Sequence, residues 1–203
     1  MTKRAPGGAR VAEPEVRVRM ASDARRAQLL ALGLEMFSAR SWDAVQIDDV
    51  AQAAGVSKGL LYHYFPTKRA FYAEVVREAA RQLVEMCDTP ESMPPHERLT
   101  TGLTRYLDFA ERHAPAYVTL MRGGIGSDPV VAAIVEDTRR QLLARLQRAV
   151  GGDAPPPTLR LTLRGWLGLV EATSIDWLVT RELARDEVLA LWVRALLALA
   201  PTA

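Results

Sequence analysis

The chain has 203 residues, of which 49% are hydrophobic and 25% charged, so one large or two small domains with a sizeable core are expected. Its single cysteine, Cys87, excludes an intrachain disulfide and a thiolate metal cluster and favours a reducing cytoplasm. The sequence contains no signal-peptide core and no run of about 20 apolar residues, so no membrane-spanning helix is expected.

The first 20 residues mix proline, glycine and charge, and we expect them to be disordered. Basic residues concentrate towards this end: residues 1–73 hold 11 Lys and Arg against 7 Asp and Glu, whereas the remainder holds 15 against 17. A positive excess is what a surface that neutralises DNA phosphates requires. The segment 1–20 is therefore either a solubilising tail or a basic arm that follows phosphates or enters a minor groove.

A first helix is predicted over residues 22–40, with Ser22 or Asp23 as its N-cap and Leu29 and Phe37 facing the core. Two short helices follow it. Apolar residues at helical spacing define the first of the pair, and the second begins at a serine suited to capping.

The turn between these short helices has a glycine at the position that needs it. Ile47, Val50 and Ala54 fall on one helical face, and Gly55 then supplies a left-handed backbone conformation at no steric cost. Ser57 opens the second short helix, and this arrangement is a helix-turn-helix. Such a motif places its second helix in the major groove of DNA.

The run from Val50 to Phe71 reads V-A-x-x-A-G-V-S-K-G-x-L-Y-x-Y-F-x-x-K-x-x-F and resembles the DNA-binding domain of TetR (AcrR-type) transcriptional regulators. The likeness extends back through the first helix and covers about residues 22–75. Two positions depart from the family pattern: Ser41 replaces a glycine that closes the first helix, and Gln46 replaces a capping threonine or serine. Each change costs about 1 kcal/mol or less, so neither alters the predicted fold.

The resemblance implies an all-α fold and a set of DNA contacts. Lys58 is expected at a base edge or a phosphate, and Gly59 where the backbone approaches DNA. Tyr62 and Tyr64 offer hydroxyls to phosphates or rings to thymine methyl groups, although one ring could instead pack the three-helix core. The predicted DNA-binding residues are Gln46, Ile47, Ser57, Lys58, Gly59, Leu60, Tyr62, His63, Tyr64 and Lys68. The implied domains are an arm at 1–20, a helix-turn-helix DNA-binding domain at 21–75, and a larger helical effector-binding and dimerisation domain at 76–203.

The rest of the chain also reads as helices separated by breaks. A connecting helix is predicted over residues 68–87, followed by a proline-rich break at 88–97. An amphipathic helix then ends near His113, and a short one precedes a glycine-rich stretch. Asp128 and Pro129 are a cap and a first-turn proline for the next helix.

The last two helices, residues 158–181 and 186–199, are the predicted dimer contact. The first of them carries two apolar stripes, one suited to the core and one, rich in small residues, suited to a partner subunit. In the family the resemblance indicates, these helices pair with their copies, so that two heads about 34 to 36 Å apart meet successive major grooves of a near-palindromic operator. The predicted interface residues are Gly165, Gly168, Ala172, Ile175, Val179, Leu189, Val193 and Leu196.

A mostly apolar effector cavity is expected inside the second domain. For each candidate residue, simple core packing is the competing interpretation. Arg122 and Glu171 would contribute only if they turn inward. The predicted lining residues are Tyr106, His113, Tyr117, Met121, Trp166 and Trp177.

The alternatives are an enzyme and a helical protein-interaction scaffold. The GGIGS stretch lacks a preceding strand and the P-loop Lys-Ser/Thr pair, and the three histidines have no carboxylate at metal-ligand spacing. No catalytic residue, cofactor or metal is therefore predicted. The resulting hypothesis is a cytoplasmic homodimeric repressor, with double-stranded operator DNA as partner, that a small, largely apolar effector releases.

Overall fold

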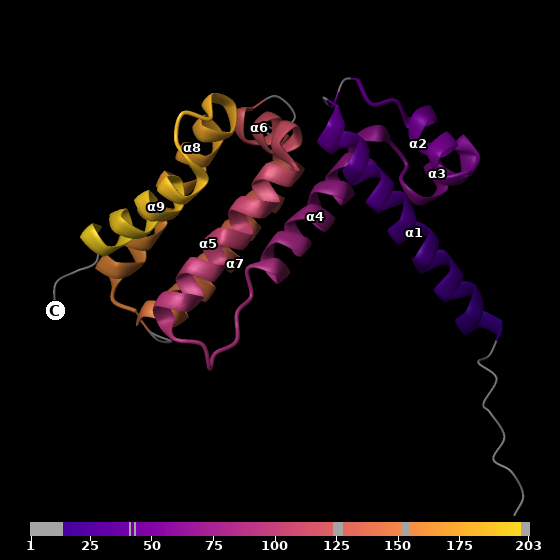
Figure 1. Ribbon diagram of the computed structural model, residues 1–203. Coiled ribbons are helices and arrows are strands. Elements are labelled where there is room, and N and C mark those ends of the chain that lie inside the picture. Colours follow the sequence, from indigo (N-terminus) through magenta and orange to yellow (C-terminus); the bar gives the residue numbers. More distant parts are fainter. Residues whose placement is uncertain (1–13, 41, 43, 124–127, 152–154, 200–203) are drawn as a thin grey trace, which may run out of the picture.

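A computed structural model describes residues 14–40, 42, 44–123, 128–151 and 155–199, and all regular structure in these ranges is helical. The all-α prediction is therefore confirmed (Figure 1). None of the helices in the described ranges is both long and apolar enough to cross a membrane. The helices are α1 (Pro14–Ala39), α2 (Ile47–Ala53), α3 (Lys58–Tyr64), α4 (Lys68–Met86), α5 (Pro95–Arg112), α6 (Ala114–Arg122), α7 (Pro129–Gly151), α8 (Pro157–Thr180) and α9 (Arg185–Leu199).

Helix α1 begins earlier than the sequence analysis predicted. Residues 14–20 are helical, so the expectation of disorder through residue 20 is wrong for them, and residues 1–13 lie outside the described ranges. Pro14 stands at the first helical position, where a missing N–H has no consequence, and neither glycine nor proline follows before Gly33. Ser22 is consequently inside the helix and caps nothing; its hydroxyl lies 3.2 Å from that of Tyr64.

Helices α1 to α4 and the start of α7 enclose the first core, in which the aromatic side chains of Phe37, Phe65 and Phe71 are buried. Gly33 of α1 lets α4 approach closely. A Cβ added there would lie 2.5 Å from Cζ of Phe71 and 2.6 Å from Cγ2 of Val75, closer than atoms can pack. The position of the helix-turn-helix on α4 therefore depends on a glycine in α1.

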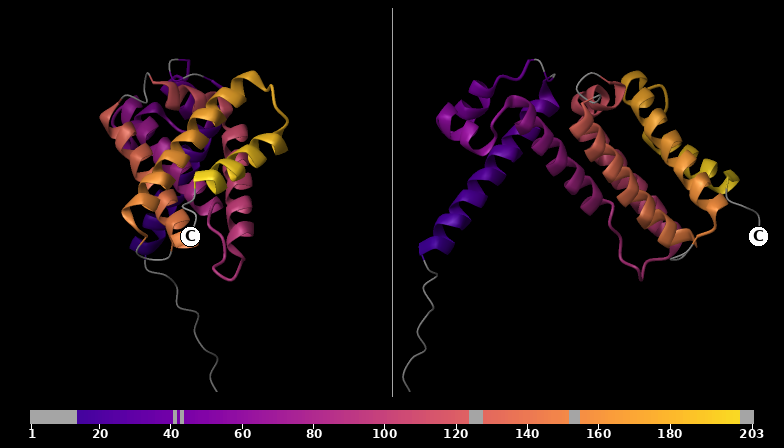
Figure 2. Two further views of the ribbon diagram at one scale, coloured as in Figure 1. Left: turned by 90° about the vertical axis from the view of Figure 1, so that its left-hand side faces the viewer. Right: turned by 180° about the vertical axis from the view of Figure 1, so that it is seen from behind.

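Helices α5 to α9 build the second core together with the far end of α4, as the view from behind shows (Figure 2). Leu107, Leu163 and Trp192 are fully buried in it. Helix α4 contributes Phe71 to the first core and Leu83 to the second. Helix α7 does the same, with Val131 and Ile134 in the first core and Leu143 in the second, so α4 and α7 together link the two parts of the molecule.

Capping residues fix where the long helices begin. Thr67 Oγ1 accepts a hydrogen bond from Ala70 N at 3.0 Å at the start of α4. Asp128 Oδ1 accepts one from Val130 N at 2.9 Å at the start of α7, as predicted, and the same carboxylate pairs with Arg69 of α4. The beginnings of α4 and α7 are therefore held together by an ion pair.

Candidate DNA interface and ligand cavity

The predicted turn between α2 and α3 is present. Gly55 has φ of +64°, and its N–H donates to Gln52 O at 3.1 Å. Val56 N donates to Ala51 O at 3.0 Å, and Ser57 Oγ then accepts from Leu60 N at 3.1 Å as the N-cap of α3. These bonds set the direction in which α3 leaves the turn.

One face of α3 is anchored in the core and the other is open to solvent. Leu61 is fully buried, whereas Leu60 and Tyr62 are each 38% exposed. Lys58 and His63 are exposed on the same short helix. An exposed leucine and tyrosine between two basic side chains form a surface that combines cationic, hydrogen-bonding and apolar groups.

Lys58 is tethered to α2. Its Nζ lies 2.8 Å from Oδ1 of Asp48, and this hydrogen bond, followed by the charge of Asp48, raises the pKa of the lysine. Both side chains are more than half exposed, so the pair stabilises the fold little. An anion that approaches Lys58 exchanges places with Asp48 at small cost.

Gly59 is the second residue of α3, and glycine has a lower helix propensity than alanine. An added Cβ would meet only Ser57 Oγ, at 3.9 Å, and the backbone is not in a left-handed conformation. Packing among the described residues therefore does not require glycine here. A glycine would be required at this position if an external partner approached the backbone of α3 closely.

Three predicted DNA-binding residues have roles within the protein. The side chain of Ile47 is 6% exposed and belongs to the first core, because it starts the buried face of α2; only its backbone amide stands at the helix N-terminus. Tyr64 packs against that core and contacts Ser22, so it is the tyrosine that packs. Lys68 Nζ lies 4.5 Å from the centre of the Trp42 ring.

Gln46, another of the predicted DNA-binding residues, directly precedes α2. It has extended backbone geometry and its side chain makes no capping hydrogen bond to the helix, consistent with the weak cap that the sequence predicted. Two acidic residues, the exposed Asp48 and the half-buried Asp49, follow in the first turn of α2. Their negative charges interact favourably with the positive end of the helix dipole and so stabilise the start of α2 without a side-chain cap.

A cavity of about 100 Å³ lies among α1, α4, α5, α6 and α7. Tyr106, His113, Tyr117 and Met121 line it, together with apolar side chains of α4 and α7. We call this space the first cavity. The other two predicted residues, Trp166 and Trp177, do not line this cavity: Trp166 donates its Nε1–H to Trp192 O at 2.9 Å and Trp177 to Leu183 O at 2.8 Å. Both tryptophans pack α8 against the α9 end of the second core.

Two tyrosines that line the first cavity bond through their hydroxyls to a third buried hydroxyl, that of Ser174. The hydroxyls of Tyr106 and Tyr117 bond to each other, and each lies 3.3 Å from Oγ of Ser174, which is fully buried. Burial raises the pKa of both tyrosines, so they stay protonated at neutral pH. Ser174 was missed because a serine within an apolar helix gives no sequence signal of an inward position.

One ion pair also borders the first cavity. Arg139 Nε donates to both carboxylate oxygens of Glu171, at 2.9 and 3.0 Å. Glu171 thus turns inward, whereas Arg122 is exposed and outside the cavity lining. Arg139 was missed because α7 carries several arginines at equivalent spacing. The first cavity is therefore apolar with a few paired polar groups on its wall.

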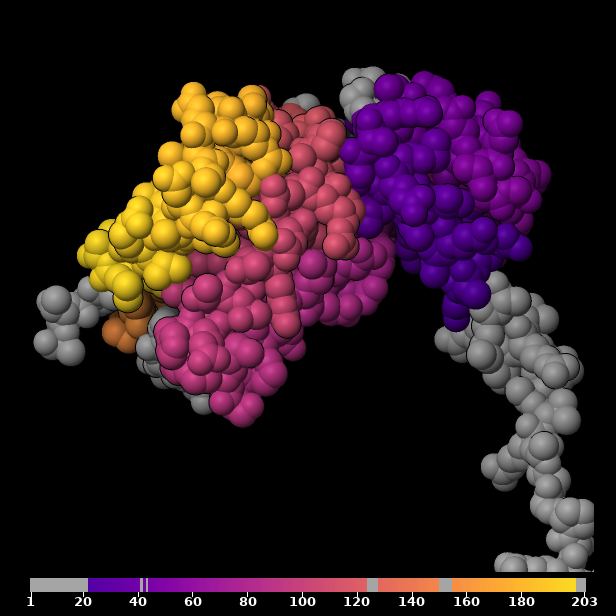
Figure 3. Space-filling view, in the orientation of Figure 1, coloured from indigo at the N-terminus to yellow at the C-terminus, as the bar shows by residue number. Residues whose placement is uncertain are grey.

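The outer face of α8 is uncovered in the single chain, at the end of the molecule opposite α2 and α3 (Figure 3). Leu161 is 76% and Val179 54% exposed, and between them lie Gly165, Gly168 and Ala172 at helical spacing. A Cβ added to either glycine would meet nothing within 4 Å. This α8 face therefore has room for a close neighbour.

The predicted dimer residues on α9 are more buried than those on the α8 face. Leu196 is 5% exposed and belongs to the second core, so its assignment to the interface is wrong. Two other predicted residues of α9, Leu189 and Val193, are partly buried against the same core, and so is Ile175 of α8. The exposed apolar residue next to Leu196 is Leu197, at 68%. The offset is one residue, which turns the helix face by about 100°.

Comparison with known proteins gives a consistent result over most of the chain. The family described as bacterial regulatory proteins, tetR family, matches residues 29–75, and the tetracyclin repressor-like C-terminal domain matches residues 95–199. A solved tetR-family transcriptional regulator from Streptomyces coelicolor is similar, with 35% identity, a TM-score of 0.82, and coverage of 87% of this chain and 80% of that one.

Curated relatives from Mycolicibacterium smegmatis are similar over shorter stretches. The transcriptional activator FasR is 31% identical over 58% of this chain and 55% of its own length. The transcriptional repressor KstR2 is 37% identical over 47% of each chain. The chain thus spans about half the length of these relatives.

Proposed function

The chain belongs to the TetR family of transcriptional regulators, and on this premise we propose that it is a homodimeric repressor that binds a near-palindromic DNA operator through α3 and leaves it when a small, largely apolar molecule occupies the first cavity. A regulator of this kind acts on DNA in the cytoplasm and is not an enzyme. It needs no metal or cofactor for this role.

The observation that carries the proposal is Gly59. This glycine lowers the helix propensity of α3 without relieving a contact among the described residues, which is expected where a ligand comes close to the backbone. Lys58 beside it is a donor for guanine acceptors or phosphate once it leaves Asp48. Ser57, Leu60, Tyr62 and His63 complete the proposed contact surface, and Gln46 and Lys68 flank it.

Dimerisation is supported by the α8 face defined above. Exposed Leu161 and Val179 are unfavourable in water, and small residues between them allow two α8 helices to approach closely. A two-fold axis through this face places one α2–α3 pair on each side, which is how a dimer meets two half-sites. We keep three partly buried residues, Ile175, Leu189 and Val193, in the proposed interface.

Selection of bound fragments from a random DNA library, followed by gel shift with the recovered sequence, tests the proposal. The expected result is a two-fold repeated motif that binds the wild-type chain and that binds Gly59→Asp at least tenfold more weakly, since the carboxylate would face phosphates. A reporter gene placed behind the motif separates repression from activation. If no motif is recovered and the chain instead binds another protein through α3, the result would favour the alternative of a helical protein-interaction scaffold.

A further inference from the structure

A second cavity, of about 150 Å³, lies at the other end of α5 from the first one. It is bounded by the end of α4, the first half of α5, the last turns of α7 and the middle of α8. Its walls are mainly apolar and include Leu99, Leu103, Leu143, Leu146 and Trp166. Nothing in the proposed function uses this space.

Three arginines stand around the second cavity, Arg98, Arg145 and Arg148, against two acidic residues, Asp88 and Glu91. Arg145 forms a long ion pair with Asp88, 3.5 Å from Nε to Oδ1, and its Nη1 donates to Gln141 O at 3.5 Å, while the buried Nε has no hydrogen-bond partner among the described residues. A buried guanidinium nitrogen without a partner is energetically unfavourable. A bound anion would supply the missing acceptor.

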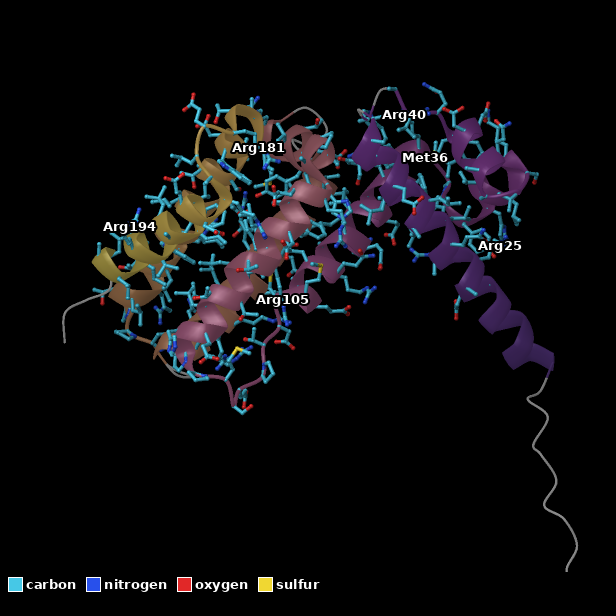
Figure 4. All side chains as sticks on the ribbon, in the orientation of Figure 1. Arg25, Met36, Arg40, Arg105, Arg181 and Arg194 are labelled. Atoms are coloured by element: carbon cyan, nitrogen blue, oxygen red, sulfur yellow. The ribbon has the colours of Figure 1, made fainter. Side chains whose placement is uncertain are left out.

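Arg105, a neighbouring arginine, stabilises the α4–α5 connection that forms one side of the second cavity. Arg105 projects from α5 beside α4 (Figure 4) and donates to the backbone carbonyls of Met86, at 3.0 Å, and Asp88, at 2.7 Å. These bonds hold the connection between α4 and α5. Arg105 is therefore structural, whereas Arg148 is exposed and Arg145 is held only by long contacts to Asp88 and Gln141, for which an anionic ligand would compete.

The two cavities share a wall. Tyr106 and Leu142 line both of them. The hydroxyl of Tyr106 belongs to the bonded set with Tyr117 and Ser174 at the first cavity. A ligand that fills the second cavity therefore rests against a side chain that also shapes the first.

We propose that the second cavity binds a small amphipathic anion. Its apolar body lies between Leu103, Leu143 and Trp166, and its carboxylate or similar group faces Arg145 and Arg148. Apolar walls favour a hydrocarbon body, and planar guanidinium groups match carboxylate geometry in a partly desolvated site. This binding is independent of DNA and goes beyond the proposed release mechanism.

Calorimetry on the full chain with octanoate, 1-octanol and octylammonium tests the proposal, because these three probes share a hydrocarbon body and differ in charge. Octanoate is expected to bind about tenfold more tightly than octanol, and octylammonium more weakly than both. The double variant Arg145→Gln, Arg148→Gln removes the preference for octanoate. Arg140→Gln, which changes an exposed arginine of α7 that does not line the second cavity, retains it.

Two cavity-filling variants identify which cavity holds the probe. Gly102 lines the second cavity, where an added Cβ would have only Cys87 O within 4 Å, at 3.9 Å. Ala116 lines the first. Gly102→Phe should abolish octanoate binding and Ala116→Phe should preserve it, with circular dichroism confirming that both variants fold. Equal binding of octanoate and octanol, no binding, or loss only in Ala116→Phe would overturn the proposal, whatever the result with DNA.

Discussion

Ser38 Oγ and His113 Nδ1 lie 2.7 Å apart across 75 residues of sequence. His113 is at the junction of α5 and α6 and lines the first cavity, and Ser38 is in the last turn of α1. Burial, followed by the charge of Arg112, lowers the pKa of His113, so its ring is neutral at pH 7. The bond connects the wall of the cavity to the helix that supports α2 and α3, and under the proposed release mechanism we expect a ligand to act on the DNA-binding residues through it.

This connection predicts a measurable coupling energy. In a double-mutant cycle with Ser38→Ala and His113→Phe, urea unfolding should give an interaction free energy of about 1 kcal/mol, because each single variant leaves the other group without its partner. Strictly additive changes in the free energy of unfolding would show that the two residues do not act together. Ser22→Ala provides a control on α1, since Ser22 contacts Tyr64 instead.

Gly59→Ala should have opposite effects on stability and on DNA binding. The free energy of unfolding should rise by up to about 1 kcal/mol, since the new methyl group meets no close atom and alanine favours the helix. Affinity for the operator, measured by fluorescence anisotropy, should fall. Gly102→Ala is the matched control, because it also replaces an uncrowded helical glycine and should stabilise without weakening DNA binding.

Lys58 and Lys68 should affect DNA binding in different ways. Lys58→Ala is expected to weaken operator binding about tenfold or more and to relax the preference at one base pair. Lys68→Ala should weaken all sequences alike and reduce the salt slope by about one unit per subunit. Asp48→Asn, which releases Lys58, should increase affinity. Equal losses on operator and random DNA for both lysine variants would contradict this division.

Cys87 should react slowly in the folded protein. Burial raises the pKa of its thiol to about 12, so at pH 8 only about one molecule in ten thousand carries the reactive thiolate. The rate of alkylation by iodoacetamide should therefore increase about tenfold per pH unit between pH 8 and 11, and urea should remove the protection. A folded-state rate at pH 8 close to that of a free thiol would be inconsistent with this burial.

The sequence predicted those features that depend on local patterns. Ser57 and Asp128 cap helices as their positions indicated, and Gly55 adopts the predicted left-handed conformation. Local patterns do not reveal contacts between distant segments. The contacts of Lys68 with Trp42 and of Ser38 with His113 both depend on how whole helices pack, so neither could be predicted from local sequence.

Local patterns also do not distinguish chemically similar residues that lie close together on one helix. Tyr62 and Tyr64 have the same chemistry two positions apart, yet one is exposed and the other packs against the first core. Leu196 and Leu197 differ by one position, and only the former is buried. Periodicity identifies a stripe, but the direction in which the stripe points is set by the neighbouring helices.

The number of chains bound to one operator duplex tests the central claim most directly. Light scattering should give two wild-type chains per duplex, whereas Gly168→Asp, which places a charge on the uncovered face of α8 without crowding its own chain, should disrupt the pair and weaken binding. Ala132→Asp on the exposed face of α7 should leave two chains bound. One wild-type chain per duplex, or two chains that Gly168→Asp does not separate, would contradict the account.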